Sequence, residues 1–105
     1  MDQKKISQLE NSVEQNPQNA LMHYTLGVEY LRVDQPKKAI HMLRKSIDLE
    51  PDYSAAYREL GKALLKINSK REAIEIFNKG IAVAEEKGDI QTAKEMRVFL
   101  NRISQ

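Results

Sequence analysis

The chain has 105 residues, of which 41% are hydrophobic and 30% are charged, and its net charge is +2. This composition is typical of one folded domain and excludes a disordered chain. The longest purely apolar run is four residues, from Ile81 to Ala84, so we expect no membrane-spanning segment and no secretory signal. The absence of cysteine excludes disulfides and thiolate metal sites, and it is compatible with the cytoplasmic location that we expect.

In the first half of the chain, apolar residues recur at steps of three and four, which predicts helices and no strands. The three helices predicted there cover residues 4–15, 20–33 and 36–49. The buried stripe of the first consists of Ile6, Leu9 and Val13. Pro17 follows its end, and Pro36 stands at the first position of the third helix, where its missing N–H costs nothing.

The second half follows the same plan. The three helices predicted there cover residues 54–67, 70–87 and 90–103. Ser69 and Glu72 have the spacing of a capping box at the start of the middle one. We expect that helix to end at Gly88, which can adopt a left-handed backbone, and Asp89 to stand at the N-cap of the last helix.

The chain repeats itself with a period of 34 residues. Leu26-Gly27 returns as Leu60-Gly61, and Ala39-Ile40 returns as Ala73-Ile74. A period of this length is typical of helical-repeat solenoids, which mostly hold other molecules rather than transform them. Because glycine inside a helix costs about 1 kcal/mol relative to alanine, we expect two helices to approach closely at each glycine.

The residues at fixed positions of the period resemble the tetratricopeptide repeat. In the first copy they are Leu26, Gly27, Tyr30, Ala39, Leu43, Ser46 and Pro51. In the second copy they are Tyr57, Leu60, Gly61, Leu64, Ala73, Phe77 and Gly80. The chain departs from the family pattern at His23, where tryptophan is preferred, at Leu64, where tyrosine is usual, and at Glu85, where the closing proline is missing.

This resemblance implies an all-α fold, a right-handed superhelix of antiparallel helix hairpins (an α-α solenoid). The expected units are a half-repeat over residues 5–19, full repeats over 20–53 and 54–87, and a capping helix over 88–105. Together they form a single domain over residues 1–105.

The resemblance also implies a partner-binding groove lined by the first helix of each repeat. The groove-facing positions hold Leu21, Tyr24, Val28, Leu31 and Arg32, followed by Ala55, Arg58, Lys62, Leu65 and Lys66. We expect a protein or peptide partner with an apolar anchor and an acidic segment, and a carboxylate gripped by both arms of Arg58. The alternative is that neighbouring helices cover the apolar residues and the lysines form a solvated face.

Some family members clamp the carboxylate tail of a chaperone through lysine, asparagine and arginine in this groove. The matching positions here hold Tyr24, Val28 and Glu59, which cannot do so, and the sequence therefore disfavours a chaperone-tail adaptor.

A second interpretation is a self-associating scaffold, a homodimer formed through the last predicted helix. The candidate dimer face consists of Met96, Val98, Phe99, Leu100 and Ile103. The alternative for these residues is that they only seal the core. A third interpretation, an RNA-binding helical repeat, is disfavoured by the net charge of only +2 and by the Leu-Gly register.

No pattern indicates an enzyme, a cofactor or a metal site. The chain has no cysteine nucleophile and no glycine-rich phosphate loop, and its two histidines lie on different predicted helices. We expect His23 to pack in the core and His41 to lie on the surface. The sequence thus favours a protein–protein interaction module.

Overall fold

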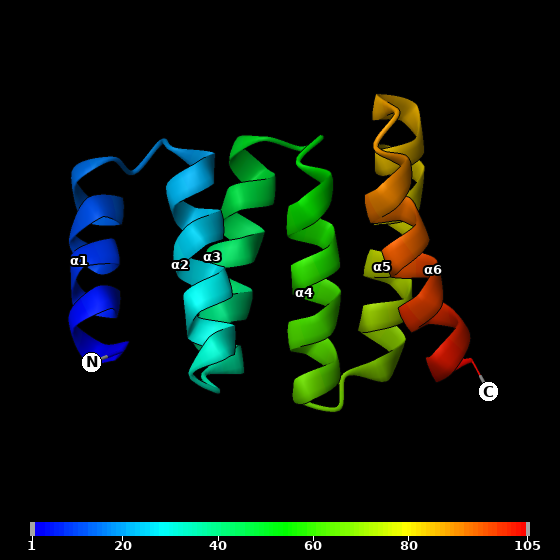
Figure 1. Cartoon of the computed structure of the whole chain (residues 1–105), viewed down its shortest axis with the longest axis horizontal. Helices are drawn as coiled ribbons and strands as arrows, with labels where there is room; N and C mark the ends of the chain where they lie inside the picture. The colour runs from blue at the N-terminus through cyan, green and yellow to red at the C-terminus, as the bar shows by residue number, and fades with distance from the viewer. Residues whose placement is uncertain (1, 105) are drawn as a thin grey trace.

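The computed structural model describes residues 2–104, and of Asp2 only the backbone. Met1 and Gln105, the two ends of the predicted domain, lie outside the described residues. Within this part there are six helices and no strands: α1 (Asp2–Gln15), α2 (Ala20–Arg32), α3 (Pro36–Leu49), α4 (Ser54–Lys66), α5 (Lys70–Lys87) and α6 (Ile90–Ile103). Figure 1 shows the helices following one another along the long axis, with α1 and α6 at opposite ends. The all-α prediction is confirmed.

The observed helices agree closely with the predicted ones. The bounds of α3, α5 and α6 are as predicted, while α1 begins two residues earlier and α2 and α4 each end one residue earlier. The turns after α2 and α4 repeat as well: Asp34 and Asn68 both have a left-handed backbone, with φ of 59° and 63°. Aspartate and asparagine tolerate this conformation. Since Asp34 and Asn68 are 34 residues apart, the backbone of the turns follows the same period as the sequence.

The helix caps follow the sequence only in part. The predicted capping box at Ser69 is wrong, because its side chain makes no capping hydrogen bond to α5. Gly88 ends α5 with φ of 79°, as predicted. Asp89 occupies the N-cap of α6, but its carboxylate accepts a hydrogen bond of 2.7 Å from the Ser54 hydroxyl, which ties the start of α6 to α4. The side-chain cap that the sequence analysis missed is at Asn19, whose Oδ1 accepts from the backbone N–H of Met22 at 3.0 Å.

The small residues of each repeat lie where two helices meet. A Cβ atom on Gly27 would come within 2.8 Å of the Leu43 side chain, so α2 and α3 touch at this point. Ala39 and Ala73 are fully buried. The predicted close approach of the hairpin helices is therefore confirmed. Each hairpin also packs on the next through α3 and α4, which makes one continuous core.

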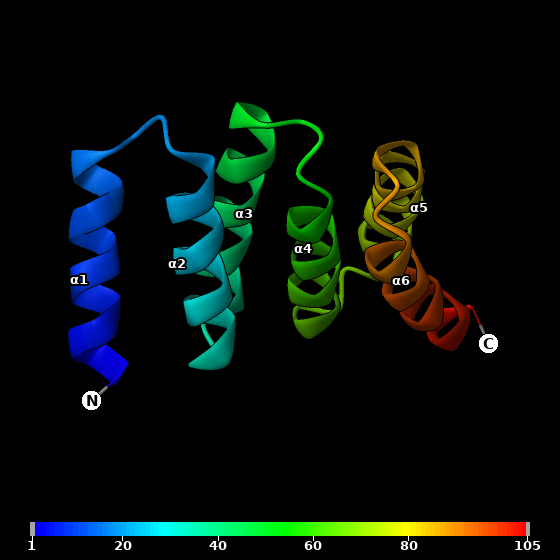
Figure 2. The same ribbon diagram turned by 45° about the horizontal axis from the view of Figure 1, so that its top comes forward.

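At the C-terminal end of the row, α6 packs on α5 and also touches α4. Ala93 and Met96 are fully buried in this contact. Figure 2 shows that α6 is inclined to the other helices. Through its contact with α4, one side of α6 borders the surface described next. None of the helices in the described residues combines the length and apolar character needed to cross a membrane.

Candidate partner-binding groove

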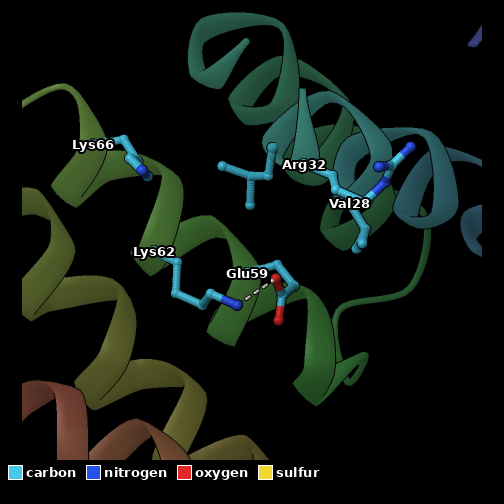
Figure 3. A pocket seen from close by; sticks show the side chains of 6 residues that line it. Val28, Arg32, Glu59, Lys62 and Lys66 are labelled. Atoms are coloured by element: carbon cyan, nitrogen blue, oxygen red, sulfur yellow. Dashed lines mark hydrogen bonds and ion pairs between the residues drawn. The ribbon is translucent and has the colours of Figure 1, made fainter. Parts of the chain in front are cut away.

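Three adjoining hollows lie along α2, α4 and α6, with volumes of about 300, 270 and 410 Å³. The first is lined by Val28, Leu31, Arg32, Glu59, Lys62 and Lys66 (Figure 3). The second is lined by Lys62, Leu65, Lys66 and Phe99, and the third by Arg58, Glu59, Lys62, Glu95 and Phe99. All three hollows share Lys62 as a lining residue, and the surface that they make up is called here the groove.

Most of the residues that the sequence assigned to a groove lie together. The structure places in the hollows Val28, Leu31, Arg32, Arg58, Lys62, Leu65 and Lys66. Three others do not line them. Leu21 is 59% exposed near the start of α2, Ala55 is half-buried, and Tyr24 stacks on Tyr53 with ring centroids 4.9 Å apart.

Arg58 is already bound within the chain. Its Nε donates to Glu59 at 2.7 Å, its Nη1 donates to Glu95 at 2.7 Å, and its Nη2 donates to the Tyr24 hydroxyl at 3.2 Å. Burial lowers the pKa of Arg58, but its bonds to Glu59 and Glu95 outweigh burial and raise that pKa. The guanidinium that the sequence analysis expected to grip a partner carboxylate thus already links α2, α4 and α6 within the chain.

The sequence analysis missed the role of Glu59 in the groove. Its side chain is only 8% exposed, and it also accepts from the Lys62 ammonium at 3.1 Å. Buried carboxylates require such partners, because an unpaired buried charge is costly. The three-residue spacing between Glu59 and Lys62 on one helix was the available signal, since residues at that spacing share a helical face.

A second buried carboxylate, Glu29, binds Arg32, which lines the groove on the α2 side. It accepts from Arg32 Nε at 2.6 Å and from the Lys5 ammonium of α1 at 3.2 Å. The hydrogen bond from Arg32, with a smaller contribution from Lys5, outweighs burial and lowers the pKa of the Glu29 carboxyl. Of the four groove cations, three are therefore paired. Lys66 has no hydrogen-bond or ion-pair partner among the described residues.

The apolar side of the groove includes Phe99, which the sequence analysis assigned to the candidate dimer face. Phe99 stacks on the buried ring of Phe77, with centroids 5.6 Å apart and planes 5° apart, and it borders the second and third hollows. Arg102 lies over the Phe99 ring, 6.0 Å from the ring centroid. This packing fixes Phe99 as a wall of the groove.

The predicted dimer face does not form one exposed surface. Met96 is fully buried against Gly80, and Leu100 and Ile103 are half-buried against the core. Only Val98, at 48%, is strongly exposed among the five. The apolar stripe of α6 is therefore mostly used to cover α5, because a terminal helix has to bury its own apolar side.

The histidines lie as predicted. His23 is 3% exposed, and its Nδ1–H donates to the Asn19 carbonyl at 2.9 Å, whereas His41 is exposed. In residues 2–104, no group of three histidine or carboxylate side chains is placed to hold a metal ion.

Comparison with known proteins agrees with this architecture. The family model of the tetratricopeptide repeat matches residues 30–96, about two thirds of the chain. A solved protein of Bordetella parapertussis is 35% identical, with 94% of this chain and 86% of that chain covered and a TM-score of 0.82. A tetratricopeptide repeat protein of Salinibacter ruber is 26% identical, with 82% and 96% covered and a TM-score of 0.77.

The TPR2B domain of yeast Sti1, solved in a complex with pHsp70, has a TM-score of 0.90 over 95% of this chain and 80% of that chain. Its identity is only 17%, so this similarity shows the fold alone. No curated protein sequence matches the chain. The helix hairpins, their 34-residue register and the family match lead to one conclusion: the chain belongs to the tetratricopeptide repeat family.

Proposed function

We propose that the chain is a protein-interaction module that binds a peptide or a helix of a partner protein in the groove. The observation that carries this proposal is the row of apolar side chains, Val28, Leu31, Leu65 and Phe99, which line hollows that no helix of the described residues fills. Apolar surface in a hollow, with polar groups placed around it, is usual in binding sites. The complex of the Sti1 domain with pHsp70 supports a protein partner for this fold.

The side chains at the chaperone-clamp positions point to a different partner from that of the Sti1 domain. Tyr24 is engaged by Tyr53 and Arg58, Val28 is apolar, and Glu59 places a carboxylate beside Lys62. A carboxylate tail bound at this end of the groove would meet the negative charge of Glu59. We therefore expect the partner to be recognised without such a clamp.

A display library of random peptides tests groove binding with no assumption about the sequence of the partner. Peptides selected on the wild-type chain are measured against Val28→Arg, which places bulk and charge inside the groove. The matched control is His41→Arg, which adds the same side chain at an exposed position that lines a separate hollow with Tyr30 and Met42. Urea unfolding verifies that both variants are folded.

We expect selected peptides to bind the wild type and His41→Arg equally, and to bind Val28→Arg at least about tenfold more weakly, a loss of about 1.4 kcal/mol. Failure to select any peptide, or selected peptides that bind Val28→Arg as tightly as the wild type, would contradict the proposal.

Self-association through α6 has one observation in its favour. Ile90 and Val98, which are 55% and 48% exposed, lie two turns apart on the same side of α6. A dimer through this side would have to use these two residues in place of the buried Met96. Sedimentation at several concentrations tests it, and a monomer at all concentrations would remove this candidate.

A further inference from the structure

The second hollow of the groove has a distinct chemistry. Leu65 of α4 and Phe99 of α6 form its walls, and Lys62 and Lys66 lie at its border, one helical turn apart on α4. Lysine stems contribute carbon atoms to such a surface while their ammonium groups remain in water. This hollow, called here the notch, is therefore an apolar recess bordered by two positive charges.

The notch is formed before any partner arrives. Phe99 is held by its stacking on Phe77, and α6 is tied to α4 by the bond between Arg58 and Glu95. A recess with fixed walls binds an apolar side chain without first ordering those walls, which lowers the entropic cost of association.

The two lysines differ in their availability. The ammonium of Lys62 is 3.1 Å from Glu59, an ion pair that Figure 3 shows as a dashed line. Lys66 lies one turn further along α4 and has no such partner among the described residues. A carboxylate that binds at Lys62 has to approach Glu59, whereas a carboxylate that binds at Lys66 does not.

We propose that the notch selects a partner segment in which a large apolar side chain stands beside a carboxylate, with the apolar side chain between Leu65 and Phe99 and the carboxylate at Lys66. This proposal rests on the proposed function and refines it. Lys66 is then the residue that determines the preference for acidic partners, and Arg58 has the structural task of joining the helices around the groove. The simpler alternative is that Lys66 only complements the negative end of the α4 dipole.

The exposure of Lys66 determines how much its charge is expected to change the affinity for a peptide. Because Lys66 is exposed, its pairing with a carboxylate should change affinity by about two- to fivefold at low salt, and by less at high salt. Burial of the apolar side chain is the larger contribution, and its truncation to alanine should weaken binding by about tenfold or more.

Three labelled twelve-residue peptides, acetylated and amidated, provide the probes for fluorescence anisotropy. The first has leucine flanked by glutamates in an alanine background, the second has glutamine in place of each glutamate, and the third has alanine in place of leucine. Each is titrated with the wild type, with Lys66→Met, and with the control Lys79→Met, which removes the same charge from an exposed position on α5 that borders a different hollow.

We expect the wild type and Lys79→Met to prefer the glutamate peptide over the glutamine peptide by about two- to fivefold in low salt. That preference should disappear in Lys66→Met, while the loss caused by leucine-to-alanine substitution remains in all three proteins. A preference that survives in Lys66→Met, equal binding of the glutamate and glutamine peptides by the wild type, or no binding of the glutamate peptide would overturn the inference. The library selection would still decide whether the groove binds peptides at all, so the two failures are distinguishable.

Discussion

Gly61 lies directly against the ring of Phe77, and a Cβ atom on Gly61 would come within 2.3 Å of the ring atom Cε1. The ring cannot withdraw easily, because its other neighbour is the stacked ring of Phe99 at 5.6 Å. The contact between Gly61 of α4 and Phe77 of α5 thus also affects the position of Phe99, the α6 residue that borders the groove.

We predict that Gly61→Ala destabilises the fold by about 1–3 kcal/mol, even though alanine is the better helix former by about 1 kcal/mol. The reason is overpacking against Phe77. Urea unfolding measures the change, and Ala82→Gly at an exposed position of α5 measures the helix preference alone. A Gly61→Ala chain that is more stable than the wild type would show that the helices can move apart at no cost.

The two leucines of the repeated Leu-Gly pair should be equally important for stability. Leu26 and Leu60 are each 2% exposed, and we predict that Leu26→Ala and Leu60→Ala each cost about 2–5 kcal/mol in urea unfolding. Leu21→Ala is the matched control, because Leu21 is 59% exposed and its loss should cost less than about 0.5 kcal/mol. A loss at Leu26 or Leu60 no larger than that of the control would mean that the inward face has been assigned wrongly.

Arg58 should contribute to stability although it lines the groove. Its removal leaves the buried Glu59 with only Lys62 and leaves Glu95 without this link to α4, so Arg58→Met should cost about 1–3 kcal/mol. The matched control is Arg97→Met, which breaks a pair with Glu85 in which both side chains are about half exposed and should cost at most about 1 kcal/mol. Equal costs for the two variants in urea unfolding would argue against a structural role for Arg58.

The buried Glu29 predicts a pH-dependent contribution to stability. Since its pKa in the folded chain is lowered, the ionised carboxylate stabilises the fold above its ordinary pKa of about 4.3, and this stabilisation is lost as the pH falls through the folded value. Glu29→Gln should therefore be less stable than the wild type at pH 7, with the difference closing below about pH 4.

Urea unfolding between pH 7 and pH 3 measures the Glu29 effect, and Glu86→Gln at an exposed position of α5 should show little change at either pH. A difference for Glu29→Gln that is the same at every pH would mean that ionisation of Glu29 does not stabilise the contact between α1 and α2.

The fold could be predicted because its information is local and repeated. The sequence pattern places every helix within two residues of its observed bounds. This pattern consists of apolar residues at steps of three and four positions, together with the prolines and the glycines. The capping box failed at Ser69, because a favourable spacing does not ensure that the side chain turns toward the helix end. Helix bounds thus depend mainly on the hydrophobic pattern and on the turn residues.

The groove could be located from the sequence, but its electrostatics could not. The period assigns a face to each side chain, yet it cannot show that Glu95, 37 residues from Arg58, would bind that guanidinium. The same limit applies to Phe99, which has the spacing of a sealing residue on α6 and also borders the groove. Both facts depend on how α6 packs against α4 and α5, which the sequence pattern does not specify.

The central claim is that partners bind in the groove, and amide chemical-shift mapping by NMR tests it most directly. The isotope-labelled wild-type chain is titrated with a peptide from the library selection. We predict that the largest shifts cluster at Val28, Leu31, Lys62, Leu65 and Phe99, with little change around His41. Shifts that cluster around His41 and Met42, or along the exposed side of α6 at Ile90 and Val98, would contradict the account.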